Sequence, residues 1–314
     1  MDQIDFALCM MLVWNSRTPY RELAETFKMS VNSIHKRVKA MVKLGIIDKF
    51  TTNLNLPAYS KTTSNLVMFG DSKANNIKGV IEKLGVNENI YTVSQHSSNF
   101  FIIHALTRTP NQLEPLVSFV KLTAEIPELK VGLQSPPIQS ESDVDMTREL
   151  NVSDTDFLII NALKDNSRKT IVEIAEEIGI STKTVRRRLD KLLENHIIHF
   201  TIHWYPDKSS EIIVMIVLTL KPSITVDKTK LIDAMREQYS QKMLFTWTFS
   251  TLPNTIILSI WVSSMKELQD IHSSLISDEF EMISLNVGIE GKIFPTWREK
   301  YLEDKIKEIR GKTS

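Results

Sequence analysis

The sequence of 314 residues has one cysteine, few glycines and no long apolar run, and each shortage excludes a class of protein. Cys9 alone cannot form a disulfide within the chain or a multi-cysteine zinc or iron–sulfur site. The nine glycines do not have the spacing of GxGxxG, of a Walker A loop or of GxSxG, so the usual nucleotide-binding and hydrolase motifs are missing. The longest apolar stretches, residues 6–14 and 212–220, are well short of the roughly 20 residues that cross a bilayer.

The formal net charge is also zero, from 38 Lys and Arg against 38 Asp and Glu, so the overall charge indicates no partner. No basic segment precedes the apolar residues at the N-terminus, as a secretory signal would require. A hydrophobic content of 42% indicates folded domains. We therefore expect a cytoplasmic protein with no membrane segment, made of several domains of the usual size of about 100–200 residues.

The chain repeats itself at an offset of 151 residues. Residues 5–47 align without a gap onto residues 156–198, and 13 of these 43 positions are identical. The longest identical run is Asn15-Ser16-Arg17, which matches Asn166-Ser167-Arg168. A long fixed period indicates duplicated structural units. Residues between the two copies are rich in proline, serine and acidic residues, which predicts a linker.

Each copy begins with the same predicted elements. Apolar residues at helical spacing predict three helices near residues 4–13, 20–27 and 31–44, and a strand follows at 46–52. The second copy repeats this order, with its third helix at 182–193. Three short helices followed by a β-hairpin are typical of a winged helix-turn-helix.

The rest of each copy has the order βαββαβ, which predicts a ferredoxin-like sandwich in which two helices cover one face of a four-stranded antiparallel sheet. The other face is expected to pack against a partner sheet. The fold class is therefore α+β. The predicted domains are a winged helix-turn-helix at 1–58, a ferredoxin-like domain at 62–134, a linker at 135–150, a second winged helix-turn-helix at 151–207, a second ferredoxin-like domain at 209–292 and a helical C-terminal tail at 293–314.

This pattern resembles the Lrp/AsnC, or feast/famine, family of transcriptional regulators, and the whole chain resembles a tandem fusion of two members. The residues that carry the resemblance are Asp5 and Asp156, the two Asn-Ser-Arg runs, Glu173-Ile174-Ala175-Glu176, Gly179-Ile180-Ser181, Arg37 and Arg188, and Ile46-Ile47 and Ile197-Ile198. The resemblance implies binding of double-stranded DNA through the third helix. It also implies pairing through the sandwiches, here as an internal pseudo-dimer that a second chain can extend to a homodimer, and a small-molecule effector.

The third helix of each copy carries a charge of +4, over residues 31–44 and 182–193, although the chain as a whole is neutral. We expect Val31, Ile34, Val38, Met41 and Val42 to face inward in the first copy, and Val185, Leu189, Leu192 and Leu193 in the second. The residues expected to contact DNA are Ser30, Asn32, Ser33, His35, Lys36, Lys39 and Lys43 in the first copy and Ser181, Lys183, Thr184, Arg186, Arg187 and Lys191 in the second. Because the two sets differ, unlike half-sites are expected. Arg37 and Arg188 lie on the helix flank, where an ion pair and a phosphate contact are both open.

Other polar residues suggest further sites. The family's Gly-Asp-x-Asp-like hairpin is replaced by residues 95–99 and 250–254, in which Asn99 and Asn254 occupy matching positions and are the expected effector-site residues. His196, His199 and His203 surround the second wing without a complete ligand set, so contacts with phosphate or water are expected rather than a metal. No metal or other cofactor is expected.

Three classes of function fit this architecture. The favoured one is a DNA-binding regulator, and the second is a structural or sensing protein without DNA binding. The third is an enzyme, because siroheme decarboxylases share the architecture that this sequence resembles, a winged helix followed by a sandwich. Those enzymes typically carry a His-Arg pair just after the wing, which residues 48–52 and 199–204 lack. We therefore expect a regulator and not an enzyme.

Overall fold

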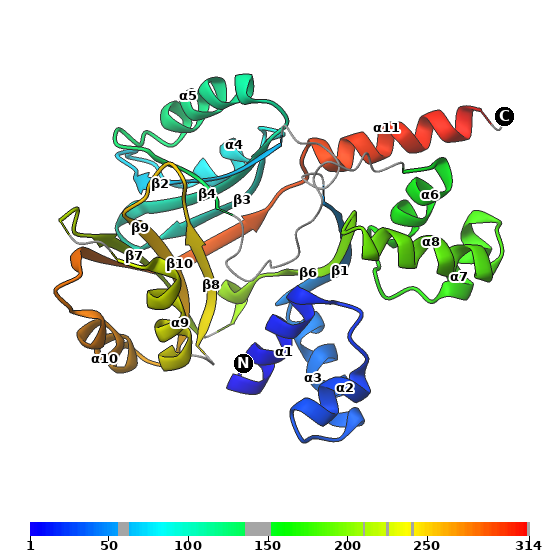
Figure 1. Cartoon of the computed structure of the whole chain (residues 1–314), viewed down its shortest axis with the longest axis horizontal. Helices are drawn as coiled ribbons and strands as arrows, with labels where there is room; N and C mark the ends of the chain where they lie inside the picture. The colour runs from blue at the N-terminus through cyan, green and yellow to red at the C-terminus, as the bar shows by residue number, and fades with distance from the viewer. Residues whose placement is uncertain (56–62, 136–151, 210, 224–225, 240–241, 313–314) are drawn as a thin grey trace. The chain divides into compact units, whose positions relative to one another are not determined.

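The computed structural model describes residues 1–55, 63–135, 152–209, 211–223, 226–239 and 242–312 (Figure 1). The chain divides into two compact units that each draw on both halves of the sequence. Unit 1 consists of Met1–Lys61, Asp143–Lys208 and Pro295–Ser314, and unit 2 of Thr62–Ser142 and Ser209–Phe294. The predicted linker at 135–150 lies outside the described residues except for Ser135. In the described part of the chain, no helix is long and apolar enough to span a membrane.

Unit 1 contains two similar three-helix segments, each followed by one strand. The first comprises α1 (Gln3–Trp14), α2 (Tyr20–Thr26), α3 (Val31–Lys43) and β1 (Ile47–Leu54), and the second α6 (Asp154–Leu163), α7 (Ile171–Ile178), α8 (Thr182–Glu194) and β6 (Ile198–Trp204). Capping boxes start α1 at Asp2 and α6 at Ser153, where the cap side chain accepts from the third helical N–H and that residue's carboxylate accepts from the cap. Buried apolar residues from all three helices of the first segment form its core, including Leu8, Leu12, Leu23, Ile34 and Val38.

The strand of each segment pairs with the strand of the other segment. β1 and β6 form a two-stranded antiparallel sheet in which Phe50 lies opposite Ile202 and Thr51 opposite Thr201. The predicted hairpin within each copy is therefore wrong for the described strands, because each one finds its partner in the duplicate. An isolated strand leaves its backbone N–H and C=O groups unpaired, and the two copies satisfy each other's.

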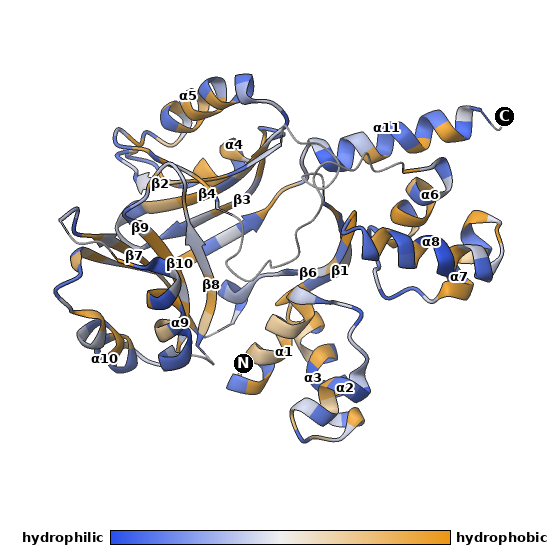
Figure 2. Ribbon diagram, viewed as in Figure 1, coloured by the Kyte–Doolittle hydropathy of each residue, from blue (hydrophilic) through white to orange (hydrophobic). Residues whose placement is uncertain are grey.

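A final helix, α11 (Trp297–Gly311), belongs to the same unit. It packs against α6, where the Tyr301 and Phe157 rings meet edge to face at 6.0 Å. One side of α11 is buried through Trp297, Leu302, Ile306 and Ile309, and Figure 2 shows hydrophobic and hydrophilic residues alternating along this helix. The predicted amphipathic tail helix thus covers a domain of its own chain.

Unit 2 contains two βαββαβ segments, and the α+β fold class is confirmed. The first segment comprises β2 (Ser64–Asp71), α4 (Val80–Leu84), β3 (Ile90–His96), β4 (Phe100–Thr107), α5 (Leu113–Thr123) and β5 (Lys130–Leu133). The second comprises β7 (Ile212–Leu220), α9 (Lys228–Tyr239), β8 (Met243–Thr248), β9 (Thr255–Val262), α10 (Met265–Leu275) and β10 (Phe280–Ile293).

The two sandwiches share one sheet of eight strands in the order β5-β2-β4-β3-β10-β7-β9-β8. The joint lies between β3 and β10, where Gly288 is opposite His96. The two ends of the sheet also meet, because Gln134 forms an isolated bridge with Phe249, next to a bond from Ser135 N to Thr248 O of 2.9 Å. The sheet therefore closes on itself, which leaves few free edges.

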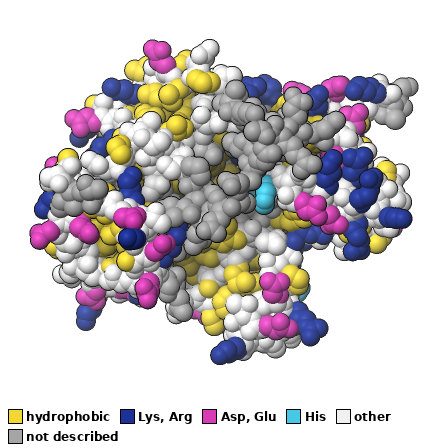
Figure 3. All heavy atoms as spheres, viewed as in Figure 1, with side chains coloured by type: hydrophobic (Ala, Val, Ile, Leu, Met, Phe, Trp, Pro, Cys, Tyr) yellow, Lys and Arg dark blue, Asp and Glu magenta, His cyan; other side chains and the backbone are white. Residues whose placement is uncertain are grey.

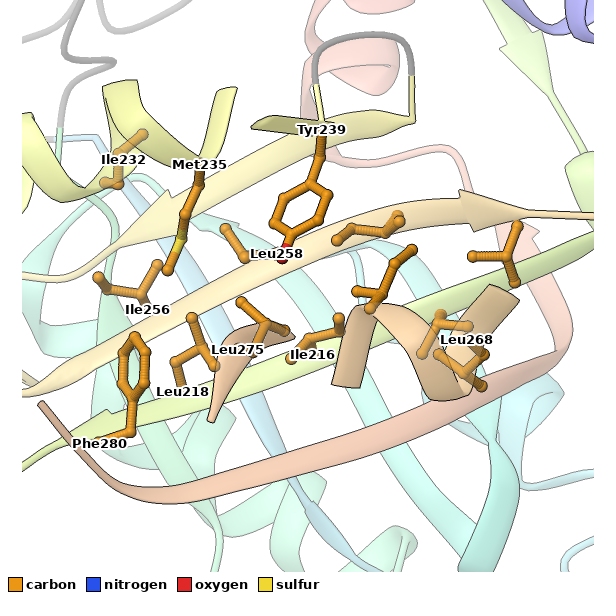
Figure 4. Close-up of a cluster of buried hydrophobic side chains, with 14 of the residues drawn as sticks. Ile216, Leu218, Ile232, Met235, Tyr239, Ile256, Leu258, Leu268, Leu275 and Phe280 are labelled. Carbon is orange, nitrogen blue, oxygen red and sulfur yellow. The ribbon is translucent and has the colours of Figure 1, made fainter. Parts of the chain in front are cut away.

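Each sandwich has its own core between its helices and the sheet. In the second one, side chains of α9 and α10 such as Ile232 and Leu268 converge on Leu218 and Leu258 of the strands (Figure 4). A separate apolar core lies on the other face of the sheet and joins both sandwiches through Phe69, Ile102, Met215, Val217, Phe249 and Ile257, among others. The face that the helices leave uncovered is therefore buried against the duplicate.

Candidate nucleic-acid interface

The candidate recognition helix of the first copy, α3, begins at a capped turn. The Ser30 hydroxyl accepts a hydrogen bond from Ser33 N at 3.1 Å, so the helix starts at a defined residue. Ile34, Val38 and Met41 are buried, which leaves the opposite side in solvent. Of the predicted DNA-binding residues, Ser30, Asn32, His35, Lys36, Lys39 and Lys43 are exposed and Ser33 is half-buried. The prediction that Val31 and Val42 face inward is wrong, since they are 47% and 41% exposed.

The matching helix of the second copy, α8, has the same construction. The Ser181 hydroxyl accepts from Thr184 N at 3.2 Å, and Val185, Leu189 and Leu192 are buried. The predicted residues Ser181, Lys183, Arg186, Arg187 and Lys191 are exposed, and Thr184 is half-buried. Leu193 is half-buried rather than fully inward. Figure 3 shows Lys and Arg side chains grouped over the part of the molecule that contains α7 and α8.

The turn before each of these helices requires a left-handed backbone. Gly179 has φ of 72° and the equivalent Lys28 has φ of 52°. The turn geometry is therefore kept in the first copy although a lysine replaces the glycine, at the cost of some strain. Since both copies keep the turn and the capped third helix, both present the same helix-turn-helix to solvent.

Arg37 and Arg188 form structural ion pairs. Arg37 Nη1 lies 2.7 Å from Asp5 Oδ1 and 2.8 Å from Asp2 Oδ2, and Arg188 Nη1 lies 3.3 Å from Asp156 Oδ2. The hydrogen bond to Asp5 raises the pKa of Arg37 above its ordinary value. These pairs attach the third helix of each copy to the start of its first helix, which resolves the two alternatives for these arginines in favour of the ion pair.

The charges along the two candidate helices differ. On α3, Lys36, Lys39 and Lys43 are exposed and no acidic residue lies between them. On α8, Asp190 and Glu194 alternate with the basic residues, and an open hollow of about 540 Å³ beside the helix is lined by both signs. The cations of α8 that have no adjacent acid lie in its first turns, where residues of a recognition helix reach base edges.

His199 and His203 of the second wing lie in β6, and His196 lies just before this strand. Among the described residues, no three His, Cys, Asp or Glu side chains lie close enough together to hold a metal ion. His203 Nδ1 lies 4.0 Å from an Asp48 carboxylate oxygen, yet burial lowers the pKa of His203 to about 4. The imidazole is therefore neutral near pH 7, and the wing gains no charge from it.

The predicted effector residues lie in equivalent hairpins of unit 2. Asn99 and Asn254 are both exposed, and their backbone carbonyls accept from Ser72 N at 3.0 Å and Leu220 N at 2.8 Å respectively. Asn99 has a positive φ of 58°. These bonds hold the two hairpins in place, and the contacts of the asparagine side chains with an effector stay a prediction.

The sequence reasoning missed one cluster of residues, which lies between the two winged domains. Ser16, Arg17, Ser167 and Arg168, here called the dyad cluster, each form a hydrogen bond with a residue of the other copy. The signal was present, because these residues belong to the longest identical run between the copies. Identity alone indicates common ancestry, whereas a contact between equivalent residues needs the two copies to be placed together.

A family model described as winged helix-turn-helix DNA-binding matches residues 1–48 and 152–199. The HTH-type transcriptional regulator Ptr1 of Methanocaldococcus jannaschii is 37% identical over 90 residues, which cover 27% of this chain. The HTH-type transcriptional regulator LysM of Sulfurisphaera tokodaii is 34% identical over 55 residues, or 18% of this chain. The matches span 60% of the length of Ptr1 and 39% of that of LysM.

The fold of a siroheme decarboxylase matches almost the whole chain. The siroheme decarboxylase NirDL superposes with a TM-score of 0.59 over 98% of this chain and 100% of its own, at 8% identity. At that identity the likeness concerns the fold. The expectation that the chain is not an enzyme, which was based on the missing His-Arg pair, is contradicted by this match, because an enzyme has the same fold over nearly the whole chain.

Proposed function

We propose that the chain is a transcriptional regulator of the Lrp/AsnC type, with the winged helix-turn-helix present twice, and that it binds double-stranded DNA through α3 and α8. The observation that carries the proposal is the same in both copies: a capped third helix whose buried side packs on its domain and whose exposed side holds cations and amides. Such a helix enters the major groove.

The predicted DNA-binding residues fall into two groups by their place along each helix. Those of the first turns reach base edges, where Arg bonds guanine and Asn bonds adenine. They are Ser30, Asn32, Ser33, His35 and Lys36 in α3 and Ser181, Lys183, Thr184, Arg186 and Arg187 in α8. The later cations, Lys39 and Lys43 in α3 and Lys191 in α8, meet phosphates, which position the protein on the duplex.

In-cell DNA occupancy mapping of the wild type and of Arg186→Glu/Arg187→Glu tests the proposal. We expect discrete sites in the wild type that the variant loses. A matched control is Lys121→Glu/Lys266→Glu, which reverses two exposed charges on the helices of unit 2 and should leave the sites unchanged. Binding of purified chain to selected duplexes should weaken steeply with salt. Occupancy that is equal in all three proteins would favour the structural or sensing class without DNA binding.

The finer part of the proposal is that the two halves of one chain act as an internal pseudo-dimer. The β1–β6 pairing, the eight-stranded sheet and the shared apolar core support it. One chain should then occupy both half-sites of a duplex, and a second chain should add a homodimer contact without being needed for binding. Mass measurement of the DNA complex tests this, since a complex that always contains two chains contradicts it.

A small-molecule effector at Asn99 and Asn254 is a further part of the proposal, supported by their exposure at equivalent hairpins. Thermal shifts with a panel of amino acids and related metabolites should identify a ligand that raises the melting temperature of the wild type. The variant Asn99→Ala/Asn254→Ala should lose that shift while it keeps the melting temperature of the free protein.

A second candidate function is binding of a tetrapyrrole, which the shared fold with siroheme decarboxylase over nearly the whole chain favours. A change in the visible absorption of siroheme on addition of the protein would support it. A spectrum that remains that of free siroheme at excess protein would remove this candidate and leave the DNA-binding proposal untouched.

A further inference from the structure

Two equivalent serines meet between the winged domains of unit 1. Ser16 Oγ and Ser167 Oγ lie 2.6 Å apart, and both residues are fully buried. Because they are separated by 151 residues, the same offset as the repeat, their contact lies on the pseudo-two-fold axis that relates the two copies. The corner between the first and second helices of each domain is thus the point at which the domains touch.

The neighbouring arginines bind across the same axis. Arg17 Nη1 donates to Ser167 O at 2.9 Å, and Arg168 Nη2 donates to Thr18 O at 3.0 Å. Arg17 also lies 5.2 Å from the ring centre of Phe200, on the other copy's strand, and Arg168 lies 5.0 Å from that of Phe50. Each guanidinium is therefore held by a carbonyl and an aromatic ring of the opposite copy.

These two cations are placed at an electrostatic cost. Burial lowers the pKa of both arginines, and the charge of Arg168 lowers that of Arg17 further. In the described part of the chain neither arginine has a carboxylate within ion-pair distance. Two half-buried like charges stay together only where the surrounding contacts fix them, so the geometry of this corner is strongly determined.

The paired strands join the same corner from the other side. Ser16 N donates to Phe200 O at 3.3 Å and Ser167 N to Phe50 O at 3.1 Å. The Thr51 hydroxyl donates to Lys164 O at 2.6 Å, which attaches β1 to the end of α6. Each domain is thus bonded to the strand that emerges from the other, and the two cannot rotate independently while these bonds hold.

We propose that Ser16, Arg17, Ser167 and Arg168 are positioning residues that fix the distance and rotation between α3 and α8, so that the chain accepts DNA half-sites at one spacing only. The proposal rests on the DNA-binding function proposed above. Half-site spacing in helix-turn-helix proteins follows from the geometry that relates the two recognition helices. Winged domains joined by a flexible connection would bind half-sites at several spacings, whereas domains fixed by the hydrogen bonds of the dyad cluster bind them at one.

Selection from a pool of random duplexes tests the proposal, because the enriched sequences report both half-sites and the distance between them. The full chain should enrich two motifs at a single spacing. Arg17→Met/Arg168→Met should enrich the same motifs over spacings that differ by several base pairs, with single half-site affinity within about twofold of the wild type because the recognition helices are unchanged. A single, unaltered spacing in the variant would overturn the proposal.

A disulfide at the dyad gives a test in the opposite direction. In Ser16→Cys/Ser167→Cys the two sulfurs replace hydroxyls that are 2.6 Å apart, and a disulfide needs about 2.05 Å. The native Cys9 does not interfere, because it is buried and its burial raises the pKa of the thiol. Oxidation should form the cross-link, visible by mass and by mobility without reductant, and Ser16→Ala/Ser167→Ala controls for loss of the hydroxyls.

The oxidised protein should keep the affinity and the spacing of the reduced one. Loss of DNA binding on oxidation, restored by reduction, would mean that the dyad opens on DNA and would overturn the proposal. Failure of the cross-link to form would overturn it as well. If the wild type enriches no sequence while the cross-link forms, the DNA-binding function fails and not the geometry of the dyad.

Discussion

The first helices of the two winged domains carry the same buried phenylalanine, yet different elements cover it. Phe6 of α1 meets Trp204, at the end of the other copy's strand, with ring centres 5.1 Å apart. The position that matches Trp204 in the first copy is Asn53, which has no ring to offer, and Phe157 of α6 is covered by Tyr301 of α11 instead. Both copies thus keep the buried phenylalanine, but a different element covers it in each: the end of β6 in the first copy and α11 in the second.

The third helices differ in a related way. Lys39 and Lys43 of α3 match Asp190 and Glu194 of α8, so the two helices carry opposite charges at these two positions. The cations of α3 continue to its last turn, while those of α8 gather near its start. Under the proposed DNA-binding function, α3 is suited to phosphate contacts along its length, and α8 concentrates its charge in the turns expected to reach bases.

Removal of residues 296–314 should have the largest effect, and only on the second winged domain. The four buried side chains of α11 contribute roughly 8 kcal/mol in total. Hydrogen exchange measured by mass spectrometry should show that α6, α7 and α8 lose protection while α1, α2 and α3 keep theirs. Equal loss in both domains would contradict the difference between the copies.

Acid should distinguish the two sandwiches. Burial lowers the pKa of His96 and His104 in the first one to about 4, from an ordinary 6.5. Both imidazoles become protonated below pH 6.5 in the unfolded chain but only near pH 4 in the folded chain. The free energy of unfolding is therefore highest above pH 6.5 and falls as the pH drops toward 4. Each histidine then costs about 3 kcal/mol of unfolding free energy, measurable by urea unfolding at each pH.

The second sandwich supplies the control for this pH dependence. His104 of β4 and Ser259 of β9 occupy equivalent positions in the two sandwiches. Each lies two residues after an isoleucine of the shared core, Ile102 in β4 and Ile257 in β9. His104→Ser should therefore reduce the change in unfolding free energy between pH 7 and 4 by about half of the histidine contribution. An unchanged slope with pH would show that His104 is not a source of the acid sensitivity.

Trp204→Asn gives β6 the residue that β1 has, and should destabilise the first winged domain. Uncovering Phe6 leaves a cavity that costs about 3 kcal/mol. Protection from hydrogen exchange should fall in α1 and remain in α6, the reverse of the result of removing α11. The comparison between the copies would fail if α6 were affected instead.

Much of this arrangement was predictable from periodicity, and the remainder was not, for a physical reason. Apolar spacing reports which side of a helix is buried, so Ile34 and Val185 were correctly placed inward. Apolar spacing does not report which element covers that side. The pairing of β1 with β6 and the packing of α11 against α6 were therefore missed. Val31 and Val42 were misplaced because each lies at the edge of the apolar stripe, where a small angular error changes exposure.

Exchanging charges between α3 and α8 should change the salt dependence of DNA binding. Lys39→Asp/Lys43→Glu gives α3 the residues of α8, and should lower the magnitude of the slope of log K against log salt by about 2 and the affinity by roughly 10–100-fold at low salt. Asp190→Lys/Glu194→Lys should raise the magnitude of the slope. Titration by fluorescence anisotropy at several salt concentrations measures the slope and the affinity of each variant. If the slope is the same in the α3 variant as in the wild type, Lys39 and Lys43 do not contact phosphates.

The smallest expected change in unfolding free energy concerns the turns on either side of the third helix, which contain residues with positive φ. Each copy has a glycine in one of these turns and a larger residue in the other. The turn before the third helix has Lys28 in one copy and Gly179 in the other, and the turn after it has Gly45 and His196, all with φ between 52° and 72°. Lys28→Gly and His196→Gly should each raise the unfolding free energy by about 1 kcal/mol, because a side chain at positive φ is strained. Gly179→Lys is the matched reverse and should lower it by a similar amount. Because a Cβ at Gly179 meets nothing within 4 Å, any loss in that variant comes from the backbone angle alone, and an unchanged urea midpoint would show that the turn holds lysine without strain.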